Sequence, residues 1–319
     1  MSGRGKRILY QIFDVVLWLC TAASVVLLLL LTVPKDDPEI AEFLALDALI
    51  LCCLFRIPVL IHELGHLLFG LIAGMRPAAF MISGICISSK GVRYVGSKAA
   101  GMTAMYPKNG RNVRGKTLAL SLGGALFGLL LGGVMLALYF ALPYHPALLF
   151  FAFLAFFVLY EAIRALIPVE LYTGKTDGAV IRGILKHAPE EEIMLRVLTV
   201  QGILFKGTFS EIPRELLYDV PVVREDLPAR RALLALRVQY ELAHKNEDDA
   251  RKLLKEFADL EEYFSQDEAD FLSRYENYFS GVFEAEKKQP LFGIRELENS
   301  LSESIKKEPC DEQDPSISM

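Results

Sequence analysis

The sequence predicts an all-α polytopic membrane protein with about four transmembrane helices, a small membrane-associated β hairpin and a cytoplasmic α-helical C-terminal domain. Two observations carry this prediction. Hydrophobic residues make up 53% of the 319 residues, and they gather in four runs long enough to cross a bilayer. Most acidic residues lie elsewhere: 29 of the 39 fall in residues 187–319, which favours a soluble part and argues against nucleic acid as a partner.

The first apolar run covers residues 8–33 and follows the basic residues Arg4, Lys6 and Arg7. It is too long for a signal peptide and no small-residue cleavage site follows it, so it predicts a transmembrane helix. This helix and its outer loop form the first of three predicted parts, residues 1–40. The second part is a membrane core at 41–186, which contains the other apolar runs, at 41–74, 118–142 and 147–167.

Charged loops set the expected orientation. Residues 75–117 hold eight basic residues and no acidic one, whereas the loops at 34–40 and 143–146 hold one basic residue, Lys35. The positive-inside rule then places the 75–117 loop and both termini in the cytoplasm. We therefore expect a multi-pass protein of the cell membrane, surrounded by the lipid bilayer.

Short stretches in the basic loop have the composition of strands. They are Met81–Ser88, Val92–Val95 and Met102–Tyr106, with a turn signal at residues 89–91 between the first two.

The second apolar run contains the sequence His62-Glu63-Leu64-Gly65-His66. Residues four apart share one face of a helix, so His62 and His66 can bind one metal ion together. Zinc with two imidazoles and one further ligand keeps a position for water, and Glu63 is placed to take a proton from that water. Two histidines and a carboxylate are costly in a membrane span, which favours a functional site over a chance match.

A two-histidine site needs a third protein ligand, and the candidates are Asp177, His187, Glu161 and Glu170. Asp177 and Gly178 open an amphipathic run after Pro168 ends the last apolar run. An aspartate at that junction can face back into the bundle, while Gly178 permits close backbone packing. The alternative is that Asp177 is a plain helix cap.

Arg56 is a charge at membrane depth, next to a Pro58 that is expected to break the second apolar run. On an unbroken helix Arg56 would share a face with Glu63, and it could orient that carboxylate or a substrate carbonyl. The alternative is a structural pair with Asp47 or Glu161.

Taken together, these features resemble the site-2 protease family over about residues 41–186. The likeness rests on HELGH in a membrane helix, a basic loop with strands, a glycine-rich span and a later span followed by Pro and Asp-Gly. Members of that family are intramembrane zinc metallopeptidases that cleave transmembrane segments of other proteins. The resemblance implies that His62, His66 and Asp177 hold zinc and that Glu63 is the catalytic base.

The chain departs from the family pattern at two places. In the glycine-rich span Gly124, Gly128 and Gly132 recur every four residues, which lets another helix approach closely, but the family's G-P-x-x-N is G-A-L-F-G here. Ala165 stands at the family's second asparagine position, and Pro168 lies nine residues before Asp177 instead of five. Both family asparagines are therefore missing, which leaves open how a scissile carbonyl is held.

Residues 187–319, called the tail from here on, have the pattern of a helical domain. Helices are expected at Leu227–Lys245 and Glu247–Phe264, and a second pair at Asp267–Lys287 and Leu291–Lys306. Such pairs weakly resemble tetratricopeptide repeats. Residues 307–319 have the composition of a disordered end, and the rest of the tail is a possible site for a cytoplasmic regulatory protein.

The expected function is regulated intramembrane proteolysis: a zinc metalloendopeptidase hydrolyses peptide bonds in or near the transmembrane segments of a membrane-protein substrate. Such a substrate must unwind before it is cut, and strands of the 75–117 loop could pair with the unwound segment. The alternative is a non-proteolytic, zinc-containing membrane scaffold that signals through the tail. An intact Glu63 weighs against the scaffold, because a purely structural zinc site needs no base.

Overall fold

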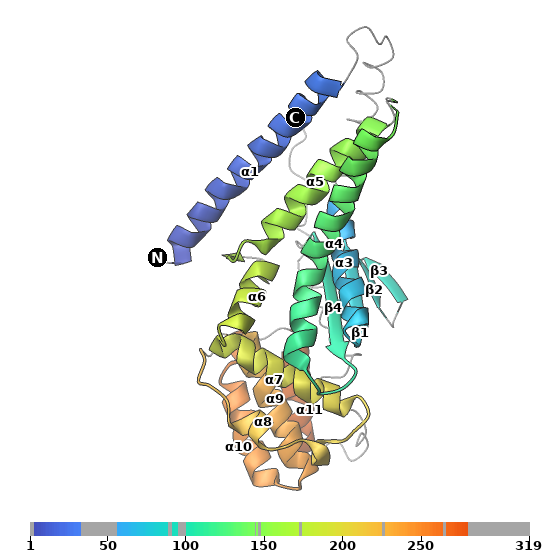
Figure 1. Ribbon diagram of the computed structural model, residues 1–319. Coiled ribbons are helices and arrows are strands. Elements are labelled where there is room, and N and C mark those ends of the chain that lie inside the picture. The colour runs from blue at the N-terminus through green and yellow to red at the C-terminus, as the bar shows by residue number, and fades with distance from the viewer. Residues whose placement is uncertain are drawn as a thin grey trace, which may run out of the picture.

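The computed structural model describes residues 3–32, 56–88, 91–94, 100–143, 145, 148–171, 174–224, 227–263 and 266–279. This part of the chain is mostly helical and contains one four-stranded antiparallel sheet and one two-stranded sheet. Figure 1 shows long helices at one end, the tail helices gathered at the other, and the larger sheet beside α3 and α4.

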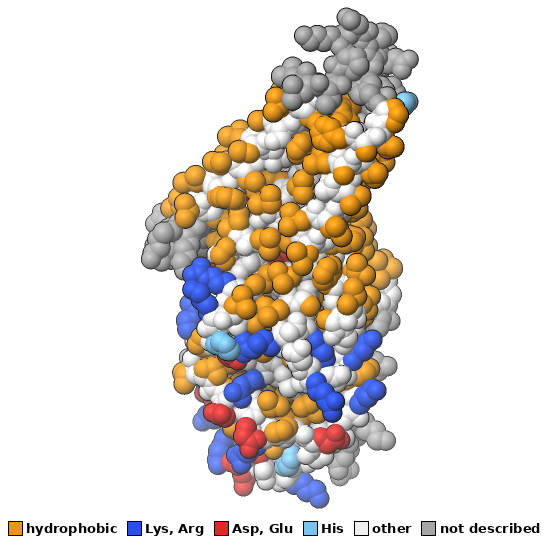
Figure 2. Space-filling model, viewed as in Figure 1, with side chains coloured by type: hydrophobic (Ala, Val, Ile, Leu, Met, Phe, Trp, Pro, Cys, Tyr) orange, Lys and Arg blue, Asp and Glu red, His pale blue; other side chains and the backbone are white. Residues whose placement is uncertain are grey.

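Three described helices are long and apolar enough to cross a membrane: α1 (Gly3–Thr32), α4 (Val113–Ala141) and α5 (Leu148–Leu166). They agree in length and composition with the spans expected at 8–33, 118–142 and 147–167. The fourth expected span is described only from residue 56 onward, where α3 (Ile57–Ile72) is apolar but has 16 residues. Figure 2 shows apolar side chains over this part of the molecule and Lys and Arg side chains gathered where it meets the tail.

Helix α3 begins directly after Arg56, and Pro58 lies in its first turn. Proline is tolerated there because the first amides of a helix have no intrahelical acceptor. The helix ends at Ile72, and two residues later Gly74 has a φ of 80°, the left-handed conformation that glycine supplies most readily after a helix. The chain then reverses directly into the sheet.

Glycines set the packing of α4 against α3 and α5. A Cβ on Gly65 of α3 would lie 2.5 Å from the Gly123 carbonyl oxygen of α4, so these two backbones are in direct contact. Gly128 and Gly132 face the other neighbour, because a Cβ at either position would press on Ala162 or Leu159 of α5. The close helix approach predicted from the glycine spacing is confirmed, and α4 makes it on two sides.

The sheet has strands β1 (Met75–Ile82), β2 (Ile85–Ser88), β3 (Gly91–Tyr94) and β4 (Gly101–Pro107) in the order β3-β2-β1-β4. The predicted hairpin is therefore an underestimate, and a single strand over Met81–Ser88 is wrong. Ser83 and Gly84 have φ values of 50° and 81°, and they form a two-residue turn between the paired residues Ile82 and Ile85. Two central residues with positive φ are typical of a tight hairpin whose twist matches its strands.

After α5, a short hairpin of β5 (Glu170–Leu171) and β6 (Gly174–Lys175) leads to α6 (Asp177–Leu185) and α7 (Pro189–Leu204). No helix was predicted at the position of α7. It shares a core cluster with α4 and α6, made of Val113 of α4, Ile184 of α6 and Leu195 of α7, which we call the junction cluster.

The remaining tail elements are η1 (Phe209–Glu211), α8 (Glu215–Tyr218), α9 (Pro228–Ala243), α10 (Glu247–Ala258), η2 (Glu261–Tyr263) and α11 (Gln266–Phe279). The helix expected at Leu227–Lys245 is confirmed as α9. The one expected at Glu247–Phe264 ends earlier, at Ala258. The helix expected from Asp267 begins as α11, whereas Leu291–Lys306 and 307–319 lie outside the described residues.

Helix α9 lies between two hydrophobic clusters. On one side, Leu236 of α9 packs with Leu217 and with Val197 and Val200 of α7. On the other side, Leu234 and Val238 of α9 pack with Phe257 and Phe271. The full burial of each such side chain contributes about 1.5–3 kcal/mol. Helix α7 therefore belongs to two cores: the first of these clusters and the junction cluster.

Candidate metal centre

Helix α3 places His62 and His66 on one face, one turn apart. Their side chains are buried, with ring centroids 4.6 Å apart and the two Nε2 atoms 3.0 Å apart. The i, i+4 spacing brings the rings together as expected. Space for them comes from α4, because a Cβ on Gly124 would lie 2.6 Å from Cε1 of His62 and 2.7 Å from Nε2 of His66.

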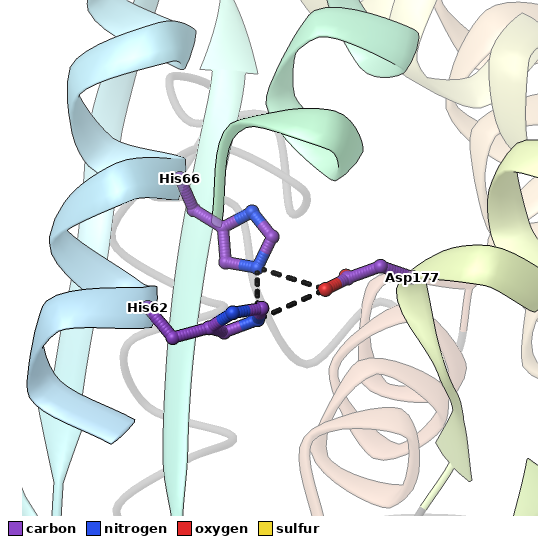
Figure 3. Close-up of side chains that lie close together, drawn as sticks. All are labelled: His62, His66 and Asp177. Carbon is purple, nitrogen blue, oxygen red and sulfur yellow. Dashed lines mark hydrogen bonds and ion pairs between the residues drawn. The ribbon is translucent and has the colours of Figure 1, made fainter. Parts of the chain in front are cut away.

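Asp177 reaches the same point from the start of α6. Its Oδ2 lies 2.9 Å from Nε2 of His62 and 3.2 Å from Nε2 of His66, as Figure 3 shows. Asp177 is not the N-cap of α6: Thr176 fills that position, and its hydroxyl oxygen accepts the amide of Ala179. The alternative of a plain helix cap is therefore wrong for Asp177.

Two contacts fix α6 where Asp177 can reach the histidines. The hydroxyl of Thr176 donates to the carbonyl of Ile167 at 2.6 Å, just beyond the end of α5. Gly178 lies against the same place, because an added Cβ would come within 1.9 Å of the Leu166 carbonyl oxygen. The close backbone packing expected of Gly178 is confirmed.

The hydrogen bond made by His66 determines which of its nitrogens is free to bind a metal. Nδ1 of His66 lies 2.7 Å from the carbonyl oxygen of Leu120 in α4. A carbonyl only accepts, so this shorter contact favours the tautomer with its hydrogen on Nδ1, although the amide of Gly124 also points at Nδ1 from 3.3 Å. In that tautomer Nε2, which lies towards His62 and Asp177, is the nitrogen that can bind a metal. Metal-binding histidines are commonly oriented in this way by a backbone carbonyl.

The three converging atoms suit a metal ion. Two imidazole nitrogens and a carboxylate oxygen converge on one point, with 2.9–3.2 Å between them, and each of these atoms can be a metal ligand. Tetrahedral coordination with bonds of about 2.0–2.1 Å separates ligand atoms by about 3.3–3.4 Å, so movements of a few tenths of an ångström would admit the ion. Among the described residues this is the one such group of three or more histidine, cysteine or acidic side chains.

The other candidates for a third ligand lie outside this group. Glu161 instead makes an ion pair with Arg164, whose Nη2 lies 2.6 and 2.8 Å from the two carboxylate oxygens. His187 is exposed and its Nδ1 lies 3.0 Å from Glu192. Glu170 belongs to the β5–β6 hairpin. Of the partners considered for Arg56, Glu161 is thus engaged by Arg164, and Asp47 lies outside the described residues.

Glu63 is buried beside the histidines and is held by strand β4. The hydroxyl of Thr103 donates to its Oε2 at 2.6 Å, and Gly101 of the same strand lies so near that a Cβ would be 2.8 Å from Oε1. Neither residue was predicted from the sequence. Thr103 offers only a small hydroxyl between apolar neighbours, and that pattern does not reveal what the hydroxyl faces.

Ion pairs brace the α6–α7 corner next to the centre. Arg114 at the start of α4 pairs with Glu192 and donates to the carbonyl of Ile184 at 2.6 Å. Burial tends to raise the pKa of Glu192, but the hydrogen bonds and charges of Arg114 and His187 outweigh it and lower that pKa.

Lys175 of β6 braces the same corner, with Glu190 at 2.6 Å and Glu191 at 2.5 Å. Burial tends to lower the pKa of Lys175, and the two carboxylates outweigh it and raise that pKa. Helix α6, which carries Asp177, is therefore tied electrostatically to both α4 and α7.

Compared with known proteins, the chain matches no family model, no curated protein and no solved structure.

Proposed function

We propose that the protein is an intramembrane zinc metalloendopeptidase of the site-2 protease type, with His62, His66 and Asp177 as zinc ligands and Glu63 as catalytic base. The observation that carries the proposal is the convergence of two Nε2 atoms and one carboxylate oxygen, beside a second carboxylate that is not part of the group. The ligands come from residues 115 positions apart in the chain, and an apolar helical bundle surrounds them.

Zinc in such a site lowers the pKa of a bound water to about 7 and polarises a carbonyl group. Glu63 would accept one proton from the attacking water and give it to the nitrogen of the leaving amine as the C–N bond breaks. The water oxygen becomes part of the new carboxyl group, whose own proton is released at neutral pH, so the products are an amine and a carboxylate. Thr103 holds one oxygen of Glu63, which leaves the other oxygen for these two proton transfers.

The position of the centre supports a proposal for the substrate class. His66 contacts Leu120, and α4 begins seven residues earlier, at Val113. At 1.5 Å per residue this places His66 about 10 Å inside the end of α4 that carries the basic loop. A soluble loop would have to enter the bilayer to reach it, so we propose membrane-protein substrates, in a cell membrane whose cytoplasmic face carries the basic loop and both termini.

The test is cleavage of a membrane-protein substrate in proteoliposomes by the purified full chain, with and without a chelator. The parent chain should cleave, and Glu63→Gln should keep its zinc but lose cleavage, because glutamine matches the shape of glutamate and cannot accept the proton. Glu161→Gln is the matched control, since Glu161 is a partly buried carboxylate paired with Arg164 away from the centre.

Cleavage by Glu63→Gln at a rate near that of the parent chain would remove Glu63 from the mechanism. A parent chain that holds zinc and cleaves none of a panel of single-span substrates would favour the scaffold alternative.

A further inference from the structure

We propose that Thr103 is a positioning residue for Glu63, and that helix α7 of the tail fixes Thr103 through strand β4. A partner bound to the tail would then control the base without touching the metal ligands. The catalytic consequence rests on the proposed function, whereas the mechanical link from α7 to β4 can be tested without it.

Strand β4 contacts the carboxylate of Glu63 through Thr103 and Gly101. A threonine hydroxyl has one hydrogen, and at 2.6 Å from Oε2 it is placed to give that hydrogen to the carboxylate. Gly101 limits the carboxylate from the other side, since a Cβ there would lie 2.7 Å from Cγ of Glu63. The orientation of the base is thus set by two residues of one strand and not by α3 alone.

Strand β4 pairs with β1 from Ile82↔Gly101 to Met75↔Pro107, with one irregularity between Pro77 and Ala79. Thr103 and Pro107 are four residues apart, which is about 13 Å along a strand. The extra residue at the irregularity, Ala78, belongs to β1, whereas the residues of β4 are paired consecutively from Gly101 to Pro107. A shift of β4 at Pro107 is therefore carried to Thr103 along β4 itself.

The turn after β4 packs directly on helix α7 of the tail. The turn that follows the strand touches α7 backbone to backbone: a Cβ on Gly202 would lie 2.6 Å from the carbonyl carbon and oxygen of Asn109. From the other side, a Cβ on Gly110 would lie 2.9 Å from Cγ1 of Ile203. In Figure 1, α7 crosses the end of the sheet and of α4 at this point.

A second contact lies one strand away. The guanidinium of Arg76 in β1 stacks over the ring of Phe205, 3.9 Å from its centroid, directly after α7 ends. Arg76 is paired in register with Tyr106 of β4, so this contact supports the same end of the same two strands.

Helix α7 contacts the strand that positions Glu63 and the helix that carries Asp177 at two separate places. Helix α7 braces the Asp177 helix near Glu191, whereas Gly202 lies eleven residues on, about 16 Å along the helix. Movement of the far end of α7 can therefore displace β4 while α6 stays in place. Val197 and Val200 of α7 lie in a tail core with Leu236 of α9, which connects that movement to the tail as a whole.

The first experiment compares Thr103→Val and Thr103→Ser in the purified full chain. Valine keeps the shape of threonine and removes the hydrogen bond, so kcat should fall on the order of tenfold or more, with KM and zinc content unchanged. Serine keeps the hydroxyl and should restore most of the rate. Equal rates for the parent chain and Thr103→Val would overturn the positioning role, as would a Thr103→Ser variant as slow as the valine variant.

The second experiment tests the link with Gly202→Ala, which forces the β4–α4 turn away from α7. Its matched control is Gly133→Ala in α4, where an added Cβ meets nothing within 4 Å. Hydrogen–deuterium exchange should become several-fold faster over residues 101–107 in Gly202→Ala and not in the control, with zinc content preserved in both. Phe205→Leu removes the ring on which Arg76 stacks, and it should also make exchange over residues 101–107 faster. This second variant keeps the test available if Gly202→Ala does not fold.

The outcomes separate the inference from the proposed function. Unchanged exchange at 101–107 in Gly202→Ala and Phe205→Leu would overturn the link whether or not the chain is a protease. If the chain cleaves, Gly202→Ala should lower kcat in the parent and have much less effect in a Thr103→Val background, because both changes act through one hydrogen bond. If Gly202→Ala lowered kcat equally in the parent chain and in the Thr103→Val background, the proposed link from α7 through Thr103 to Glu63 would be contradicted. A parent chain without cleavage would overturn the proposed function and the catalytic consequence together, and the exchange result would still stand.

Discussion

Gly178 and Leu166 are in backbone contact: an added Cβ on Gly178 would lie 1.9 Å from the Leu166 carbonyl oxygen and 2.4 Å from its carbon. This contact joins the first turn of α6 to the last residue of α5. The neighbouring Asp177 reaches His62 and His66 from this first turn.

Gly178→Ala should therefore lower metal content, although alanine is chemically the mildest change. Neither backbone atom can rotate away, so α6 must move by an ångström or more, which is large compared with the tolerance of a metal–ligand bond. Metal analysis of the purified variant measures the effect, with Gly133→Ala as the control glycine. Full metal content in Gly178→Ala would mean that Asp177 follows the histidines independently of its helix.

Asp177→Ala should lose most of the bound zinc, while Glu161→Ala and Glu170→Ala should keep it. The reason is that only Asp177 among these carboxylates shares a point with His62 and His66. The measurement is zinc per polypeptide after dialysis against a weak chelator. If Asp177→Ala retained full zinc, a carboxylate outside this group would have to be the third ligand.

Leu195→Ala should weaken both the fold and metal retention. Leu195 belongs to the junction cluster with Val113 and Ile184, and truncating a buried leucine costs about 2–5 kcal/mol. Leu254→Ala is the matched control, because Leu254 has the same exposure of 6% but lies in the cluster of α9, α10 and α11. Both variants should unfold at lower temperature, and only Leu195→Ala should release metal more readily.

The ion pair of Glu192 with Arg114 should make stability depend on pH in the acidic range. The pKa of Glu192 is lowered in the folded chain, so its contribution is present above the unfolded pKa of about 4.5 and disappears as the pH falls through the lower, folded value. The difference in unfolding temperature between the parent chain and Glu192→Gln should therefore be larger at pH 7 than at pH 4. Glu262→Gln, at an exposed position of η2, should show no such change.

Periodicity and spacing predicted the parts of the site that lie within one helix. His62, Glu63 and His66 are four residues apart or fewer, so their common position follows from helix geometry alone. Asp177 could be named as a candidate because Asp-Gly after a proline suggests a helix start. The resemblance already indicates Asp177 rather than Glu161 or Glu170. The fold adds that Asp177 lies next to both histidines, whereas Glu161 is engaged by Arg164.

Contacts between distant segments could not be read from the sequence. Thr103 meets Glu63 through a side-chain contact that spans forty residues, and no periodicity marks it. Helix α7 was not predicted for a related reason. It packs against α4 and α6 on one side and against α8 and α9 of the tail on the other. It therefore lacks the single apolar stripe of a surface helix. The boundary expected at residue 187 immediately precedes this helix.

Hydrogen bonds made by Thr176 explain why the number of residues between Pro168 and Asp177 can vary. The amide of Thr176 bonds to the carbonyl of Val169, and its hydroxyl bonds to that of Ile167, so the chain closes on itself before α6 begins. The β5–β6 hairpin is thus a side loop whose length does not set the position of Asp177. Insertions or deletions between β5 and β6 should therefore leave the carboxylate in the same place, and an epitope inserted there should report on the protein without disturbing its centre.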